Sequence, residues 1–203
     1  MKVVIVGYGI GNLGAIPNML QRLGVDARIS RDPATIRAAD RLILPGVGAF
    51  DAAIQALRQY DLVPVLNDRV QAGLPVLGLC LGMEIMASDS EEGTLPGLGW
   101  VPGRVVRFTL PPGDVRRIPH MGWNYITPVT DLPLLHELGE RPRFYFAHSY
   151  HFAAASPGDV AATTTYGIPF ASVIHHDNVT GIQFHPEKSH RFGLKLFENF
   201  LVP

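Results

Sequence analysis

The stretch from Leu74 to Ala87, LPVLGLCLGMEIMA, constrains the fold more than any other part of the chain. A short apolar run leads into a Gly-x-Cys-x-Gly sequence centred on Cys80, and apolar residues at helical spacing follow. Strand, sharp turn and helix in this order are typical of a nucleophile elbow. Glycines two residues before and after Cys80 suit such a turn, because it leaves no space for side chains. We therefore predict a buried strand that presents Cys80 at the start of a helix.

Cys80 is the only cysteine in the chain. A thiol at a helix N-terminus lies at the positive end of the helix dipole, so we expect the dipole to favour the reactive thiolate. The alternative interpretation is a small buried thiol packed between glycines. A single cysteine forms no internal disulfide, which predicts a reducing, cytoplasmic location.

The first half of the chain alternates short apolar strands with helical patterns. We expect helices at 51–60 and 62–72, and strands at 2–6, 25–29, 41–44 and 74–80. This alternation is typical of a doubly wound parallel sheet. Glycine-rich turns at 7–12, 45–50 and 78–82 then all lie at the carboxyl edge of the sheet, where ligands bind in such folds.

The first of these turns also matches a dinucleotide-binding pattern. Gly9-x-Gly11-x-x-Gly14 follows a strand, and Asp32 follows the next one. A lone match of this kind is weak, and Pro17 is expected to interrupt the helix behind it, because proline lacks a backbone N–H. We interpret the glycines as a close-packing turn, with a nucleotide-binding module as the alternative.

From Ser88 onward the pattern becomes antiparallel. We expect strands at 100–108, 123–129, 143–151 and 160–166, then a hairpin of 170–176 and 179–184. Ser189 is the expected cap of a last amphipathic helix. No repeat or linker interrupts the chain, so we predict one α/β domain over 1–203. It has a mixed, mainly parallel sheet flanked by helices, with an antiparallel C-terminal half.

His185 and Glu187 follow the predicted hairpin. On extended chain their side chains leave the same face, and Pro186 fixes the backbone between them. A carboxylate beside an imidazole fixes its tautomer and stabilises the imidazolium, which in turn stabilises a thiolate. Together with Cys80, these two residues compose a Cys-His-Glu triad.

Composition and the remaining histidines argue against nucleic-acid binding, membrane association and a metal site. A net charge of −1 and a pI near 6.7 give no reason to expect nucleic acid or an anionic membrane as partner. The chain begins with a strand-like KVVIV and has no apolar run of transmembrane length. Metal binding by His148 with His151, or by His175 with His176, is an alternative without an HExxH pattern to support it. We expect no metal and no cofactor.

The Gly78–Gly82 elbow and the late Phe184-His185-Pro186-Glu187 resemble the class I (triad) glutamine amidotransferases over nearly the whole chain. Further stretches are similar to one branch of that family, which works with a (β/α)8 cyclase subunit in histidine biosynthesis. These stretches are Tyr8-Gly9-x-Gly11-Asn12-Leu13, Pro45–Phe50, Pro119–Asn124, Phe146-x-His148-Ser149-Tyr150 and Gln183–Ser189. The chain departs from the family at two positions: Gly7 replaces the usual Asp, and Glu84 replaces a common Gln.

The resemblance implies a flavodoxin-like amidotransferase fold and hydrolysis of glutamine to glutamate, with ammonia passed to the cyclase subunit of a heterodimer. It implies that Cys80 attacks the amide, and that His185, held by Glu187, moves the protons. The implied oxyanion-hole donors are the backbone N–H groups of Val47, Gly48 and Leu81. The implied glutamine contacts are Glu84, Glu92, Ser149 and Tyr150. The implied partner contacts are Asn12, Trp123, Tyr145 and Lys188.

Gly46-Val47-Gly48 is a candidate switch, because flanking glycines lower the barrier to turning a peptide. We expect the Val47 N–H to point away from the substrate oxygen until the cyclase is loaded. Another triad amidotransferase or a free-standing γ-glutamyl hydrolase is the alternative enzyme, and the stretches at 119–124 and 145–150 argue against it.

Overall fold

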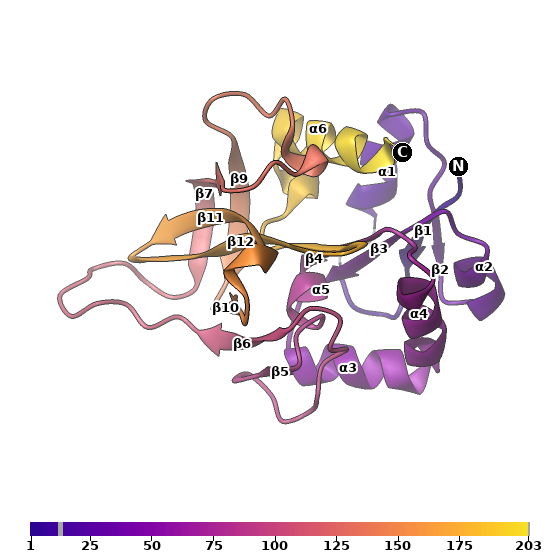
Figure 1. The fold of residues 1–203 in the computed structure, drawn as a ribbon, viewed down its shortest axis with the longest axis horizontal. Coiled ribbons are helices and arrows are strands. Elements are labelled where there is room, and N and C mark those ends of the chain that lie inside the picture. Colours follow the sequence, from indigo (N-terminus) through magenta and orange to yellow (C-terminus); the bar gives the residue numbers. More distant parts are fainter. Residues whose placement is uncertain (12–13, 203) are drawn as a thin grey trace.

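The computed structural model describes residues 1–11 and 14–202. Its main sheet has the order β2-β1-β3-β4-β13-β12-β10-β6-β5, with helices on both faces (Figure 1). Neighbouring strands are parallel from β2 to β13. These strands are β1 (Val3–Val6), β2 (Arg28–Ser30), β3 (Arg41–Gly46), β4 (Val76–Cys80) and β13 (Val179–Ile182). The predicted doubly wound, mainly parallel arrangement is therefore confirmed.

The antiparallel C-terminal half is confirmed as well. β12 (Ile168–His176) pairs with β13, and its hairpin turns at Asp177, whose φ is 51°. The strands beyond it are β10 (Tyr150–Ala154), β6 (Gly103–Arg107) and β5 (Asp89–Ser90). β11 (Val160–Tyr166) also pairs with β12, and β8 (Thr127–Pro128) pairs with β11.

Two predicted strands are each divided in the structure. The predicted strand 143–151 bends at Ser149, so that β9 (Arg143–His148) leaves the main sheet and pairs with β7 (His120–Tyr125). The predicted strand 123–129 is likewise divided between β7 and β8. The apolar pattern continues through both breaks, which is why it did not reveal that the chain changes sheet.

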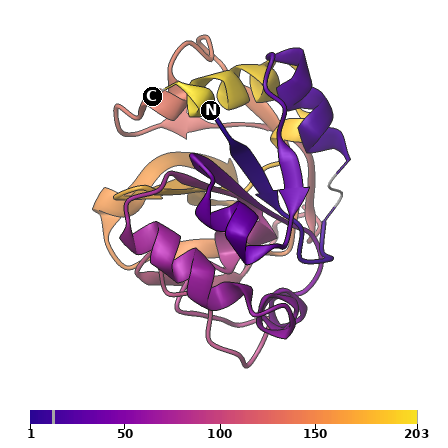
Figure 2. The ribbon, with the colours of Figure 1, turned by 90° about the vertical axis from the view of Figure 1, so that its right-hand side faces the viewer.

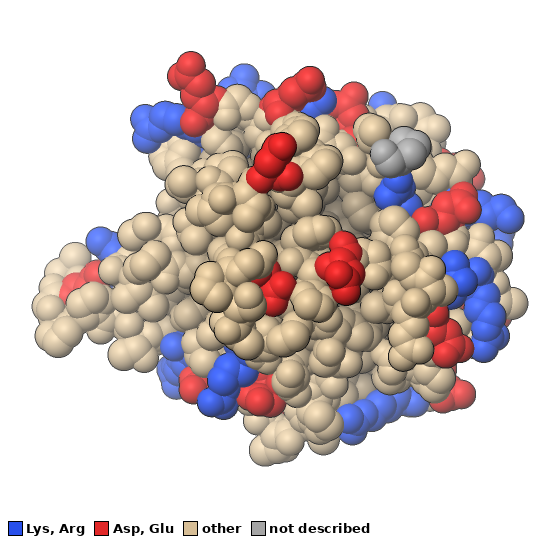
Figure 3. Space-filling model, in the orientation of Figure 1, with Lys and Arg blue, Asp and Glu red and all other residues tan. Residues whose placement is uncertain are grey.

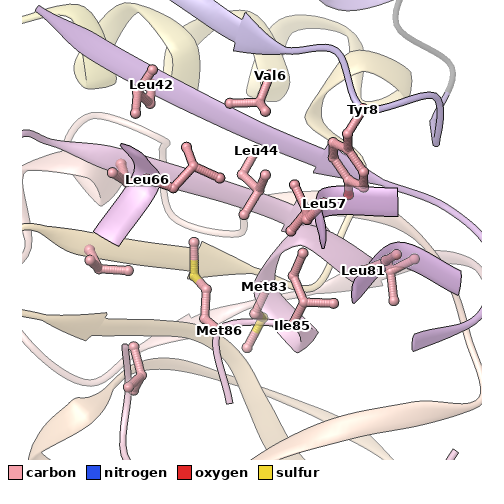
Figure 4. Close-up of a cluster of buried hydrophobic side chains, with 14 of the residues drawn as sticks. Val6, Tyr8, Leu42, Leu44, Leu57, Leu66, Leu81, Met83, Ile85 and Met86 are labelled. Atoms are coloured by element: carbon pink, nitrogen blue, oxygen red, sulfur yellow. The ribbon is translucent and has the colours of Figure 1, made fainter. Parts of the chain in front are cut away.

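The parallel strands alternate their side chains between two cores. Val4 and Leu44 face α2 (Pro33–Arg37), α3 (Phe50–Gln59) and α4 (Leu62–Gln71), whereas Ile5 and Ile43 face α1 (Ala15–Arg22) and α6 (His190–Leu201). Figure 2 shows these two helical layers with the sheet between them. Figure 4 shows the first core, where side chains of β1, β3, α3 and α4 meet those that follow Cys80.

The prediction that Pro17 interrupts the first helix was wrong. α1 begins at Ala15, so Pro17 is its third residue, in the first turn, where a backbone N–H has no acceptor within the helix. Asp32 of the dinucleotide pattern has a structural role, because its carboxylate accepts hydrogen bonds from the Ala34 and Thr35 N–H groups and caps α2.

Short helical turns complete the chain: α5 (Leu81–Glu84), η1 (Pro133–Leu135), η2 (Pro157–Asp159) and η3 (Pro186–Lys188). None of the helices in residues 1–11 and 14–202 is long and apolar enough to span a membrane. Lys and Arg alternate with Asp and Glu around the rim of the face in Figure 3, in keeping with the small net charge.

Candidate active site

β4 delivers Cys80 to the carboxyl edge of the sheet, and α5 begins at the next residue. Cys80 has φ 53° and ψ −110°, a conformation that costs energy for any residue with a side chain. The flanking glycines are required sterically: a Cβ on Gly82 would lie 1.8 Å from the Leu44 carbonyl oxygen, and one on Gly78 2.6 Å from the Gly82 carbonyl oxygen. The strained elbow predicted from the sequence is confirmed.

The helix N-terminus favours the Cys80 thiolate as predicted, through the Leu81 N–H, but other surroundings of Cys80 oppose ionisation more strongly. Burial raises the pKa of Cys80 well above its ordinary value, and the nearby Glu84 carboxylate raises it further. A hydrogen bond from the Leu81 N–H opposes the rise but is outweighed, and α5 has only four residues to supply a dipole. The thiol therefore needs a base to accept its proton.

His185 and Glu187 form the predicted pair. His185 Nδ1 lies 2.8 Å from Glu187 Oε1, and both side chains are buried. Glu187 belongs to the 3-10 turn η3 and not to extended chain as predicted, and the turn carries its carboxylate back to the ring. Because the carboxylate accepts the Nδ1 proton, Nε2 of the neutral ring is left as the base.

The His185 segment is tied to β9 by hydrogen bonds that the sequence did not suggest. The His185 N–H donates to the Tyr145 carbonyl at 2.8 Å. The Ser189 hydroxyl donates to the His185 carbonyl at 2.6 Å and accepts the Tyr145 N–H at 3.0 Å. Ser189 precedes α6 as predicted, but its side chain makes no capping hydrogen bond, because its hydroxyl is used here.

One pocket of about 300 Å³ brings the predicted site residues together. Cys80 and His185 line it, while Glu187 lies behind His185. Its remaining walls include the predicted oxyanion-hole residues Val47, Gly48 and Leu81 and the predicted glutamine contacts Glu84, Glu92, Ser149 and Tyr150. A pocket of this volume lies at the lower end of the range for small-molecule sites, which suits an amino-acid ligand.

Two buried residues beside Cys80 were missed as site residues. The Gln183 amide donates to Glu84 Oε1 at 2.8 Å, and it also forms a hydrogen bond that favours the Cys80 thiolate. Tyr8 is fully buried next to Cys80, and its hydroxyl donates to the Pro45 carbonyl at 2.5 Å. Tyr8 and Gln183 both belong to stretches that resemble the family, but only the fold shows that their side chains point toward Cys80.

The segment after β3 carries two of the predicted oxyanion-hole residues. Gly46 packs against the start of α5, where a Cβ would lie 2.9 Å from the Gly82 nitrogen. Gly48 has φ +114°, which favours glycine, and Val47 is 42% exposed. The Leu81 N–H lowers the pKa of Cys80, as a donor close to the sulfur does. The orientation of the Val47 N–H stays a prediction.

The predicted partner residues lie next to the pocket. Trp123 and Tyr145 pair across β7 and β9 with ring centroids 6.3 Å apart, and Lys188 Nζ lies 5.6 Å from the centre of the Tyr145 ring. The exposed side chains of β7 are Met121, Trp123 and Tyr125, which we call the β7 surface. Met121 and Lys188 also line the pocket. Asn12 lies outside the described residues.

Three of the four histidines considered as metal ligands form hydrogen bonds to other groups, and the fourth, His151, packs against the Phe108 ring. His148 Nδ1 donates to the Tyr150 carbonyl at 2.6 Å, and its Nε2 lies 3.0 Å from His120 Nδ1. Burial lowers the pKa of His148 to about 3 and that of His120 to about 4, so both rings are neutral. His175 bonds Thr180 and His176 bonds Asp159. In the part of the chain that the structure describes, no group of three His, Cys, Asp or Glu side chains is arranged to hold a metal ion.

Comparisons with known proteins agree with this geometry. The family described as glutamine amidotransferase class-I matches residues 4–203. The chain is 46% identical over 200 residues to the imidazole glycerol phosphate synthase subunit HisH 2 of Pseudomonas aeruginosa, with 98% of each chain covered. It is 47% identical over 202 residues to the HisH subunit of Salinibacter ruber, covering 97% of this chain and 92% of that one.

Solved structures resemble the chain in fold. One described as a glutamine amidotransferase has a TM-score of 0.74 at 22% identity and covers 98% of this chain and 96% of its own. A glutamine amidotransferase from Thermotoga maritima has a TM-score of 0.66 at 18% identity, covering 98% of this chain and 82% of its own. The expected fold is confirmed by these matches.

Proposed function

Since this chain belongs to the class I glutamine amidotransferase family, we propose that it is the glutaminase subunit of an imidazole glycerol phosphate synthase. It hydrolyses glutamine to glutamate and ammonia and passes the ammonia to a (β/α)8 cyclase subunit. The cyclase makes imidazole glycerol phosphate and an aminoimidazole carboxamide ribonucleotide in histidine biosynthesis. The whole of 1–203 acts as one amidotransferase domain in a cytoplasmic heterodimer, without a cofactor or a metal.

The observation that carries this function is the shared pocket of Cys80, on its strained elbow, and His185, held by Glu187. The Cys80 sulfur attacks the amide carbon of glutamine while His185 Nε2 takes the thiol proton. His185 then gives that proton to the nitrogen as the C–N bond breaks, which releases ammonia and leaves a thioester. Water attacks the thioester with His185 as base, and glutamate leaves as the Cys80 thiol forms again.

The oxyanion of each tetrahedral intermediate needs donors on one side of the pocket. Leu81 follows Cys80 and lines the pocket, and the Val47–Gly48 segment forms a second wall. The Tyr8 hydroxyl donates a hydrogen bond to the Pro45 carbonyl and so fixes the backbone just before this segment. A rotation of the peptide planes at 46–48 therefore need not move the strand that precedes them. We expect these N–H groups to supply the second donor when the cyclase is loaded.

Val47→Pro is expected to remove stimulation by the loaded cyclase and to lower kcat by about 10²–10³-fold, because one oxyanion donor is lost. KM for glutamine should change little. Steady-state glutaminase assays on the complex, with and without the cyclase's acceptor, measure both. Gly48→Ala should behave similarly, since φ +114° is strained for alanine.

Gly139→Ala is the matched control for the glycine change, because Gly139 also has a positive φ, 85°, and open space around it. If Gly48→Ala and Gly139→Ala leave kcat and stimulation equally unchanged, the segment does not act as the oxyanion switch. A free subunit with the Val47 N–H already directed at the thioester oxygen would contradict the switch too.

The β7 surface supports a partner contact beside the pocket. Trp123 is 42% exposed, stacks on His190 with centroids 5.5 Å apart and lies 5.4 Å from the Arg143 guanidinium carbon. Exposed aromatic residues flanked by cations are typical anchors of protein interfaces. The cyclase subunit therefore docks over β7, where its acceptor site can receive ammonia from the pocket.

Trp123→Ala is expected to weaken cyclase binding or stimulation by about 30-fold, the effect of losing an anchor worth about 2 kcal/mol. Basal glutaminase should stay measurable, because Trp123 does not line the pocket. Titration of the cyclase with glutaminase readout, and thermal unfolding of the free subunit, provide the measurement.

Tyr60→Ala is the control for losing an aromatic ring, since Tyr60 also lies under a guanidinium, that of Arg31 at 4.4 Å, but on the end of α3. If Trp123→Ala unfolds the free subunit while the surviving complex is fully coupled, Trp123 is a packing residue and the docking surface is elsewhere.

A further inference from the structure

A carboxyl group shares the pocket with the nucleophile. Glu84 lines the pocket together with Cys80, and its residue is 5% exposed. Its Oε1 accepts the Gln183 amide at 2.8 Å, and the same amide favours the Cys80 thiolate. Gln183 thus lies between the carboxyl group and the sulfur, and all three side chains are buried.

The surroundings of Glu84 do not favour a carboxylate. The titratable or charged side chains that share its pocket are Cys80, Glu92, His148, Tyr150, His185 and Lys188. None of the ion pairs formed by residues 1–11 and 14–202 includes Glu84. Burial raises the pKa of Glu84 to about 7; the Gln183 hydrogen bond opposes this rise, and Glu92 adds to it. The group therefore titrates near neutral pH.

Ionised Glu84 and ionised Cys80 oppose each other. After burial, the Glu84 carboxylate is the largest cause of the raised Cys80 pKa. Two negative charges in one dry pocket repel strongly, so that each disfavours the other. The thiolate that the reaction needs thus forms more easily when Glu84 holds a proton.

The hydrogen bonding of Gln183 also fits a protonated Glu84. A carboxylic acid has one donor and one acceptor, so Glu84 Oε1 accepts the Gln183 N–H at 2.8 Å also when Oε2 carries the proton. Protonation of Glu84 therefore keeps the Gln183 amide nitrogen in place beside Cys80.

We propose that Glu84 is a positioning residue that works in its neutral form: it holds the Gln183 amide against Cys80, and once it has lost its proton it keeps the thiol from ionising. This inference rests on the proposed glutaminase function and deepens it. It also explains how Glu84 serves where the family commonly has Gln, since a protonated carboxyl group offers hydrogen bonds like those of an amide.

The test compares native complex with Glu84→Gln, a change that keeps shape and removes the charge. Glutaminase kcat/KM is measured from pH 6 to 9.5, and so is the rate of Cys80 alkylation by iodoacetamide. In the native complex kcat/KM should fall as pH rises through about 7, because Glu84 ionises. In Glu84→Gln this loss should vanish, and alkylation above about pH 7, where native Glu84 is ionised, should be about tenfold faster, as expected for a thiol pKa one unit lower.

Glu91→Gln is the matched control, since Glu91 is a neighbouring exposed carboxylate that bonds the Arg107 N–H outside the pocket. Its profile should follow that of the native complex. Glu84→Met separates the effect of charge from that of positioning. Cys80 of this variant should be alkylated fast, but its kcat should be lower, because a methionine side chain at this position offers Gln183 no hydrogen bond.

Superimposable pH profiles and alkylation rates for native and Glu84→Gln complexes would overturn the proposal. Equal kcat in Glu84→Met and Glu84→Gln would overturn the positioning role. Alkylation of Cys80 needs no glutamine turnover, so its result is distinct from a failure of the proposed function, which appears as a native complex without glutaminase activity.

Discussion

Cys80→Ala is expected to abolish glutamine-dependent synthesis, with a loss in glutaminase kcat of order 10⁶-fold, the cost of removing the nucleophile from a catalytic triad. The assembled complex should still make its product from supplied ammonia, because the thiol serves only to liberate nitrogen. Glutamate release and product formation, each measured with glutamine and with ammonium salt, separate the two activities in one preparation.

The ammonia-dependent rate is the internal control for folding and assembly. Labelling is unambiguous as well, because the chain has one cysteine. A glutamine-analogue alkylator should mark native Cys80 and leave the variant unmodified, whereas a nucleotide-binding module should not be labelled there. Glutaminase retained in a clean Cys80→Ala preparation would refute the assignment of the nucleophile.

His185→Asn should cost nearly as much as loss of Cys80, because the residues of a triad act as a unit. The buried thiol has a raised pKa, so without the imidazole base it is not deprotonated at neutral pH. Glu187→Gln should cost less, about 10⁴-fold, since Glu187 orients and stabilises His185 across the 2.8 Å Nδ1–Oε1 bond but transfers no proton. The measurement is glutaminase kcat in the stimulated complex.

His176→Asn is the matched control for this pair of variants. His176 Nδ1 lies 2.8 Å from Asp159 Oδ1, so it is also a histidine bonded to a carboxylate, but it does not line the pocket. Its loss should leave kcat unchanged. A folded Glu187→Gln as inactive as Cys80→Ala would show that our division of roles in the triad is wrong.

Much of this site could be predicted from the sequence, because its strongest signals are local. An elbow needs glycines two residues on either side of Cys80, and the contacts of Gly78 and Gly82 are the steric reason. His185 and Glu187 are near neighbours in the chain, so that a single turn suffices to join them. The elements of the parallel half follow from apolar spacing, which is a property of short segments.

The sequence-based predictions failed where the answer depends on contacts between distant segments. The ionisation of Cys80 was misjudged because burial and Glu84 outweigh a four-residue helix, and neither is visible in a local pattern. The hydrogen bonds of Ser189 and Gln183 were missed for the same reason, since their partners lie on distant elements: Tyr145 on β9 and Glu84 on α5.

The sequence by itself thus determined the alternation of elements, the nucleophile elbow and the chemical identity of the triad, all of which depend on spacing along the chain. Only the tertiary structure decided that Cys80 and His185 share a pocket, that β9 leaves the main sheet to carry Tyr145, and that Gln183 joins Glu84 to the sulfur. The physical reason is that folding brings side chains together from distant parts of the sequence. These side chains set how deeply the site is buried, the electrostatic potential in it and the geometry of its hydrogen bonds.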